Sequence, residues 1–169
     1  MKLIKLLLCL LGTQLAFTSS SSAAAEDKQQ QAYISPWLSA CNSSSAKSEK
    51  ICTIERRVFS DQAMTKKMAS IVFRTAPGKP TFVTILSPLG ALISEGVQVE
   101  IQGQKQIKLP FLFCEQVGCI SQTELSPQDL DAFAKAKTVN FKYQLLNAQK
   151  AIIAIDMTEF KKSFEAISQ

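Results

Sequence analysis

The sequence of 169 residues contains no histidine, a single tryptophan and only two tyrosines. Without histidine the chain cannot form a Ser-His-Asp triad, a Cys-His dyad, a Cys₂His₂ zinc site or a 2-His-1-carboxylate iron site. Charged residues are 20% of the chain, and no cluster of them has the arrangement of a catalytic pair. We therefore predict no catalytic residues, no metal site and no cofactor.

The N-terminal segment has the composition of a secretory signal peptide. Lys2 and Lys5 precede the mostly apolar stretch 6–17, and the alanines that end at Ala25 form a cleavage motif before Glu26. The apolar stretch is shorter than the roughly 20 residues that a membrane span requires. We therefore expect residues 1–25 to be removed between Ala25 and Glu26, and we expect no stable membrane span.

Removal of this segment changes the cysteine count and the charge of the chain. Cys9 and two lysines are lost, which leaves four cysteines and a net charge of +3 in place of +5. An even number of cysteines in an exported chain indicates disulfide bonds. A net charge of +3 is too small to indicate a nucleic-acid partner.

Hydrophobic periodicity predicts the fold class. Residues 26–33 are interpreted as a disordered leader and residues 34–169 as one domain. Apolar and polar residues then alternate in short runs, with turns every 6–12 residues and no β-α-β order, which predicts an antiparallel β-sandwich or barrel of eight or nine strands. The alternating runs are 52–58, 97–101, 107–113 and 139–145, and the more continuously apolar ones are 69–74, 81–86 and 151–155.

Two segments have helical signals. Ser126 is a candidate N-cap, followed by Pro127 at the first helical position and Asp129 at the third. Near the C-terminus, Thr158 is a candidate cap before apolar residues at helical spacing, namely Phe160, Phe164 and Ile167. We therefore predict a sandwich with two short helices.

The four remaining cysteines are the strongest local signal. Their spacing favours local pairing of Cys41 with Cys52 and of Cys114 with Cys119, although four cysteines allow three pairings. In the chain-entropy model, closing loops of this length contributes about 3 and about 2 kcal/mol. Gly118 would allow the short loop to adopt a positive φ and close without strain.

The alternatives for these cysteines are a zinc site and a redox role. The gaps of ten and four residues differ from those of paired zinc knuckles. Cys114 and Cys119 have C-x₄-C spacing between predicted strands, where no helix N-terminus would stabilise a thiolate. If this pair is structural, we expect both sulfurs to be partly buried beside Phe111, Phe113 and Ile120.

The only tryptophan, Trp37, lies shortly before Cys41. An aromatic side chain of this size is a candidate binding anchor. The alternative is that Trp37 packs in the core or at a strand edge near Cys41.

With strands and cysteines placed, the chain resembles the invasion-associated locus B family of bacterial secreted proteins over Trp37 to Ile167. The features that carry the resemblance occur in this order: Trp37 before Cys41, Cys52 and its strand, 88–92 leading to 95–97, 109–111, Cys114, the Gly118-Cys119 pair, the helix with Leu125, Leu130 and Phe133, and the strand with Val139 and Phe141. Two departures are Glu159-Phe160, where the family usually has Gly-Phe, and Ser87 at the start of the usual Leu-Pro-Leu-Gly.

The resemblance implies an immunoglobulin-like β-sandwich, and export to the periplasm or outer surface of a Gram-negative bacterium. It also implies a link to host-cell invasion or colonisation. We therefore predict a monomeric protein that acts by binding an unknown partner: a host surface, an envelope protein or a glycan. The alternatives are a periplasmic thiol-disulfide enzyme that uses Cys114 and Cys119, and an envelope-structural factor with no host role.

Overall fold

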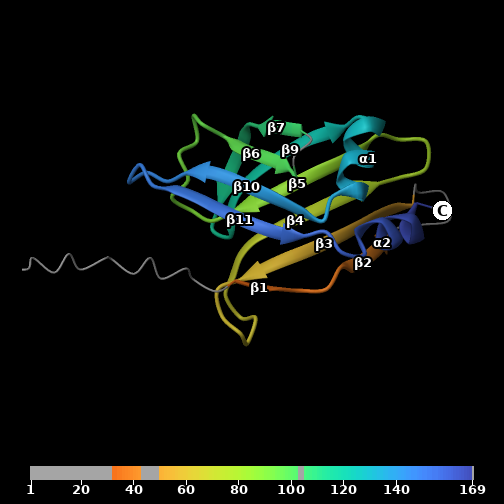
Figure 1. Cartoon of the computed structure of the whole chain (residues 1–169), viewed down its shortest axis with the longest axis horizontal. Coiled ribbons are helices and arrows are strands. Elements are labelled where there is room, and N and C mark those ends of the chain that lie inside the picture. The colour runs from red at the N-terminus through yellow and green to blue at the C-terminus, as the bar shows by residue number, and fades with distance from the viewer. Residues whose placement is uncertain (1–31, 43–49, 103–104, 169) are drawn as a thin grey trace, which may run out of the picture.

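The chain folds into two antiparallel β-sheets and two short helices. The computed structural model describes residues 32–42, 50–102 and 105–168. All strand pairings in this part of the chain are antiparallel, and Figure 1 shows the two sheets and the helices beside them. This confirms the predicted fold class. The elements are β1 (Tyr33–Ile34), β2 (Leu38–Asn42), β3 (Ile51–Phe59), β4 (Lys67–Thr75), β5 (Thr81–Ser87), β6 (Val97–Ile101), β7 (Lys105–Leu109), β8 (Phe111–Glu115), β9 (Gly118–Leu125), α1 (Pro127–Lys135), β10 (Thr138–Gln144), β11 (Lys150–Asp156) and α2 (Phe160–Ile167).

The predicted signal peptide and most of the predicted leader lie outside the described residues. The cleavage site between Ala25 and Glu26 is among them, so it stays a prediction. Tyr33, the last residue assigned to the leader, lies in β1 and pairs with Phe59 of β3.

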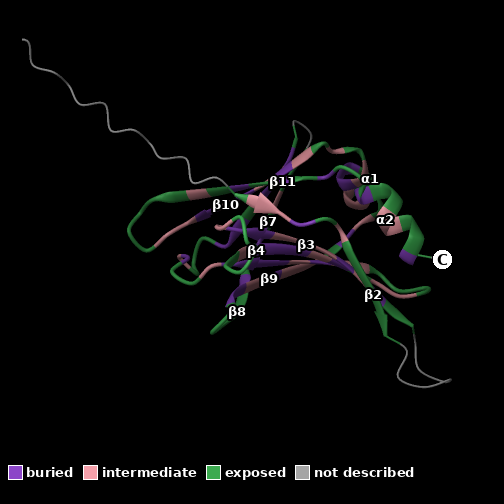
Figure 2. Ribbon diagram, turned by 90° about the horizontal axis from the view of Figure 1, so that it is seen from below, coloured by how far each residue is buried: buried purple, intermediate pink, exposed green. Residues whose placement is uncertain are grey.

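The larger sheet has seven strands, of which six lie in the order β1-β3-β4-β5-β9-β8 and the seventh, β2, also pairs with β3. Both β1 and β2 pair with β3, β1 near its C-terminal end and β2 over Ile51 to Glu55. The two short strands therefore share one edge of the sheet, and β8 forms the other edge. Figure 2 shows the difference in burial, because β2 is drawn as exposed and the central strands are largely buried.

The smaller sheet has four strands in the order β11-β10-β6-β7. Its hydrophobic residues alternate as the sequence predicted, so Val99 and Phe141 lie opposite each other on the buried face. They face the buried residues of the larger sheet, such as Ile54, Phe73 and Ile85, each of which has no exposed surface. The core lies between these two faces.

The alternating run from Ile107 to Phe113 does not continue as one strand. The chain leaves β7 after Leu109 and enters β8 at Phe111, which pairs with β9 in the other sheet. Pro110 lies between them and has no N–H for a strand ladder, so it is suited to the point where the chain changes sheets.

Helix α1 begins as the sequence predicted. The Ser126 hydroxyl accepts a hydrogen bond from the Asp129 N–H at 3.1 Å, and the Asp129 carboxylate accepts one from the Ser126 N–H at 3.2 Å. Pro127 occupies the first turn. This reciprocal capping box satisfies donors that a helix N-terminus otherwise leaves unpaired.

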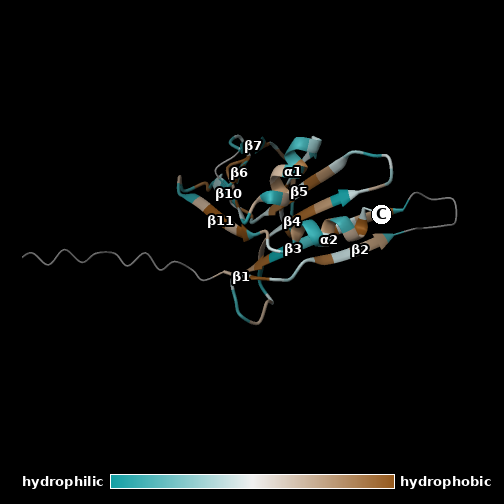
Figure 3. Cartoon of the chain, turned by 45° about the vertical axis from the view of Figure 1, so that its right-hand side comes forward, coloured by the Kyte–Doolittle hydropathy of each residue, from teal (hydrophilic) through white to brown (hydrophobic). Residues whose placement is uncertain are grey.

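The predicted cap of the second helix is wrong. The N-cap of α2 is Glu159, which has left-handed backbone angles and makes no side-chain capping bond. Thr158 instead donates its hydroxyl to Asp156 at 2.5 Å, because the chain turns tightly between β11 and α2. Figure 3 shows α1 and α2 near each other beside the larger sheet, with hydrophilic residues on their exposed surfaces.

Candidate functional site

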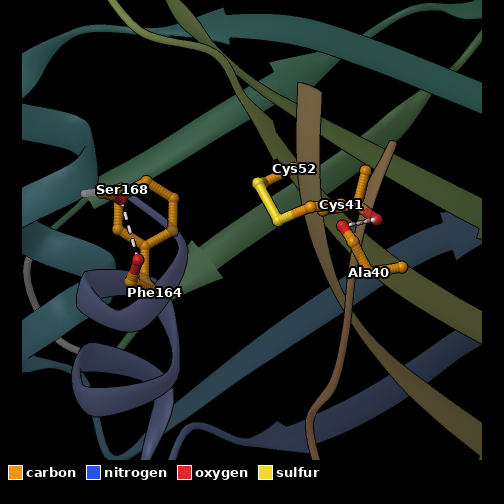
Figure 4. The surroundings of a disulfide bond; sticks show 6 residues. Ala40, Cys41, Cys52, Phe164 and Ser168 are labelled. Carbon is orange, nitrogen blue, oxygen red and sulfur yellow. Dashed lines mark hydrogen bonds between the residues drawn. A yellow bond between two sulfur atoms is a disulfide. The ribbon is translucent and has the colours of Figure 1, made fainter. Parts of the chain in front are cut away.

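Both disulfides join an edge strand of the larger sheet to its inner neighbour. Cys41 of β2 lies directly opposite Cys52 of β3, with Cα atoms 4.1 Å apart. Cys114 of β8 lies directly opposite Cys119 of β9, with Cα atoms 3.9 Å apart. These are the two pairs that the spacing predicted. Figure 4 shows the first of them between β2 and β3, with Phe164 and Ser168 of the C-terminal segment nearby.

Each disulfide has one exposed and one buried cysteine. Cys52 and Cys119 are each 2% exposed, whereas Cys41 and Cys114 are exposed. A thiolate that attacks the accessible sulfur expels its partner as a thiolate into the protein interior, where a charge is poorly solvated. This asymmetry favours bonds that resist exchange.

The hairpin between β8 and β9 closes tightly through Gly118. This glycine has a φ of +138°, and a Cβ atom built on it would lie 2.3 Å from the backbone oxygen of Ser87. Only glycine fits this approach without a shift of the backbone. The expectation of a positive φ at Gly118 is confirmed.

The side chains around this hairpin are more exposed than the sequence suggested. Phe111 is buried, but Phe113 is 49% exposed and Cys114 is exposed, so packing around the disulfide is closer on the Cys119 side, and partial burial of both sulfurs stays a prediction. The physical reason is that β8 is an edge strand and pairs with β9 alone. Leu112 and Val117 are also exposed, at 53% and 66%. The hairpin therefore carries three exposed apolar side chains on a covalently clamped edge.

Trp37 lies against an aromatic cluster at the opposite side of the larger sheet. Its ring centroid is 5.3 Å from that of Phe160 and 6.2 Å from that of Phe73. Its indole N–H donates to the Thr158 carbonyl oxygen at 3.0 Å, and the Arg56 guanidinium lies over its ring at 5.1 Å. These contacts are those of a packing residue, and its role as a binding anchor stays a hypothesis.

Charged groups near Trp37 hold the start of α2. The Arg56 side chain donates to the backbone oxygens of Ser35 and Asp156. Hydrogen bonds from the Thr158 hydroxyl and N–H, together with Arg56, keep the pKa of Asp156 below its ordinary value. Burial lowers the pKa of Arg56, and Asp156 and Glu159 oppose that effect. Thus Arg56 ties β3 to both the N-terminal segment and the turn before α2.

A second surface feature lies on the outer face of the smaller sheet. Here a groove of about 520 Å³ crosses all four strands. Four side chains form one row across the sheet, since Gln98 pairs with Lys108 and with Lys142, and Lys142 pairs with Ile152. The groove is lined by Glu95, Gly96, Gln98, Lys108, Lys142, Tyr143, Gln144, Lys150 and Ile152.

Two further observations concern metals and membranes. Within residues 32–42, 50–102 and 105–168, no group of three or more Cys, Asp or Glu side chains is placed to hold a metal ion. No helix in the same ranges is both long and apolar enough to cross a membrane.

A family model described as "Invasion associated locus B (IalB) protein" matches residues 37–168. The chain belongs to this family. The matched range contains both disulfides, the aromatic cluster and the groove. The resemblance seen in the sequence is thereby confirmed.

An IalB-type protein also has a similar structure. The crystal structure of invasion associated protein B from Bartonella henselae superposes with a TM-score of 0.66 and 14% identity, over 80% of this chain and 94% of that chain. At this identity the likeness establishes a shared fold. None of the curated proteins matches the chain. Neither the family description nor the name of the solved structure is that of an enzyme.

The disulfides of this IalB-family chain could be predicted from its sequence, but the groove could not. Lys108, Lys142 and Lys150 lie on three different strands, and nothing in their spacing along the chain relates them. The signal that brings them together is the strand register, which requires the sheet order to be known. The exposure of the apolar residues on hairpin β8–β9 could not be predicted for a similar reason, because the sequence does not say which strand is at an edge.

Proposed function

We propose that this IalB-family chain is exported and acts in host-cell entry by binding a protein on the host surface. Hairpin β8–β9 is the contact surface in this proposal. The observation that carries it is the exposed apolar surface of Leu112, Phe113 and Val117 on a strand edge clamped by a disulfide. The related protein from Bartonella henselae is named for invasion, which supports the choice of a host partner.

The hairpin has three properties that suit protein recognition. Large apolar side chains gathered on a surface mark interaction sites in soluble proteins. An edge strand has backbone groups that a partner strand can pair with. The Cys114–Cys119 bond holds the loop in one conformation, which reduces the ordering cost of association. A rigid apolar edge is thus a better protein-binding surface than a flexible loop of the same composition.

The binding test uses labelled mature protein on host cells and a matched pair of double variants. Phe113→Glu with Val117→Glu places two charges on the hairpin, where both side chains are already exposed. Ile93→Glu with Leu146→Glu makes the same change at exposed apolar residues elsewhere. We expect saturable binding that the hairpin variant weakens at least tenfold and the control changes less than twofold. Equal binding by all three proteins would overturn the proposal, as would binding that survives protease treatment of the cells.

The same preparation distinguishes the other functions. Binding to isolated bacterial envelopes but not to host cells, with the same loss in the hairpin variant, would overturn the host role in favour of an envelope-structural factor. A thiol-disulfide enzyme that uses Cys114 and Cys119 would reduce or oxidise a peptide substrate, and we expect no such turnover. Intact mass of the exported protein tests cleavage between Ala25 and Glu26, and sedimentation tests the monomer.

A further inference from the structure

The groove on the outer face of the smaller sheet is lined by three lysines, only one of which forms an ion pair within the described part of the chain. Lys142 is paired with Glu100. Within the described part of the chain, neither Lys108 nor Lys150 has a carboxylate at ion-pair distance, and Glu95 is the only acid that lines the groove. The groove therefore has a positive charge at each of two ends that no partner neutralises.

The positions of the two unpaired lysines determine the size of the ligand. Lys108 is on β7 and Lys150 is on β11, at opposite edges of the sheet. Neighbouring strands are about 4.8 Å apart, so three spacings separate these backbones by about 14 Å. Side chains in a strand stand roughly perpendicular to the sheet, so one phosphate or sulfate ion would contact both lysines only if both leaned toward each other. An extended ligand with negative charges at separate points matches the two lysines without that rearrangement.

The other lining residues suit a carbohydrate. Gln98 donates its side-chain N–H to Gln106 at 2.6 Å, which leaves its side-chain oxygen to accept from a hydroxyl group. Gln144 contributes a second amide with both donor and acceptor atoms. Ile152 is 61% exposed and lies directly opposite Lys142 on the edge strand β11, two residues from Lys150, so an apolar surface stands at the end of the row beside one of the unpaired lysines. Sugar rings present hydroxyls at their rims and C–H groups on their faces, and these groups match amides and an aliphatic side chain.

Tyr143 lines the groove from the buried side of the sheet. Burial raises the pKa of its hydroxyl, so this group stays protonated and neutral over the physiological range. Its side chain lies on the inner face of the sheet, opposite the side chains of Lys142 and Gln144, so it places no negative charge in the groove that would repel an anion.

We propose that this groove binds a sulfated polysaccharide of the host-cell surface, with Lys108 and Lys150 contacting separate sulfate groups and Ile152 contacting a sugar ring. Sulfates on successive sugars supply charges at separate points, and the rings between them supply hydroxyls and apolar faces. The groove and hairpin β8–β9 have no residue in common, so binding in the groove is independent of the protein contact, and only the host source of the polysaccharide rests on the proposed function.

The test measures binding of a heparin hexasaccharide to the mature protein by titration calorimetry at low and physiological salt. We expect Lys108→Gln with Lys150→Gln to weaken binding at least tenfold. Lys161→Gln with Lys162→Gln removes the same charge from exposed positions on α2, and should change the affinity less than twofold. Ile152→Ser, which changes no charge, should weaken binding several-fold. Unchanged melting temperature and Trp37 fluorescence establish that each variant is folded.

Three results would overturn the proposal. The first is an equal loss of heparin affinity in the two double-lysine variants. That result would mean that heparin is attracted by the overall charge of the protein, an attraction that salt screens wherever the charges lie. The second is equal affinity for a sulfonated polymer that has no sugar rings. The third is equal affinity for heparin from which the sulfates have been removed. The Phe113→Glu, Val117→Glu variant should keep its heparin affinity, so failure of the protein-binding proposal would be distinguishable.

Discussion

Replacement of Glu159 by glycine should stabilise the protein, although glycine usually weakens a fold. Glu159 has φ +64° and ψ +2°, in the left-handed region, and its side chain makes no capping hydrogen bond. A residue with a Cβ atom in this region costs about 1–2 kcal/mol. The turn requires the conformation, because Phe160 donates its N–H to the Met157 carbonyl oxygen immediately after Thr158 pairs with Asp156.

Two opposing effects reduce the expected gain. Glycine increases the conformational entropy of the unfolded chain, which costs about 0.4–1 kcal/mol. The Glu159 carboxylate also attracts Arg56, and an exposed attraction of this kind is worth a few tenths of a kcal/mol. The net prediction is a gain of about 0.5 kcal/mol. For a domain of this size, that gain raises the melting temperature by about 2 °C.

Calorimetry and urea denaturation of Glu159→Gly, Glu159→Ala and Glu159→Asn separate the contributions. The alanine variant loses the charge but keeps the Cβ atom, so it should be slightly less stable than the parent. Asparagine tolerates the left-handed region better than alanine, so the stability of the asparagine variant should lie between those of the alanine and glycine variants. Trp37 reports locally on the start of α2, because its ring packs against Phe160. A glycine variant no more stable than the alanine variant would refute the claim that Glu159 is strained.

Three further outcomes follow from other contacts. Cys114→Ala with Cys119→Ala should lower the free energy of unfolding by about 2 kcal/mol in urea titrations, as expected for a six-residue loop, and should leave Trp37 fluorescence of the native state unchanged. Trp37→Phe keeps an aromatic ring but removes the 3.0 Å bond to Thr158 and part of the indole packing, and should cost about 1 kcal/mol or somewhat more, whereas no change in the denaturation midpoint would count against that bond. Partial burial tends to raise the pKa of Asp129, but hydrogen bonds from Lys105 and Ser126 outweigh it and keep that pKa below its ordinary value. The ionised carboxylate therefore stabilises the fold above about pH 4, and this contribution is lost as the pH falls through the folded-state pKa. Asp129→Asn should therefore cost about 1 kcal/mol at pH 7 and flatten the dependence of the melting temperature on pH below 4, and an unchanged slope would contradict the capping-box assignment.

The features that could be predicted from the sequence depend on residues close together in the chain. Strand alternation is local, and so is the capping box, where Ser126 and Asp129 are three residues apart. The disulfides are also local, because each closes a hairpin between strands that are neighbours in sequence. The residues that form each of these features are close together in the sequence and also contact one another in the folded chain.

The features that could not be predicted depend on which elements are neighbours in space. Nothing near Pro110 states that the chain moves to the other sheet there, since a proline also ends strands that stay in one sheet. Thr158 has the composition of a cap, but its hydroxyl bonds to Asp156 because the entry to α2 is set by packing against Trp37 and Phe73. The exposure of Phe113 likewise follows from the sheet order, which makes β8 an edge.

The placement of the two disulfides links the stability of this fold to its surface. An edge strand buries fewer side chains than a central strand, so apolar burial contributes less to holding it in place. All five residues of β2 and four of the five residues of β8 are exposed, and each of these strands is bonded to its inner neighbour by a cross-strand disulfide. The covalent bond replaces part of the missing burial by restricting the unfolded chain. Side chains on β8 are thereby released from a packing role, and Leu112 and Phe113 can remain exposed while the strand keeps its register.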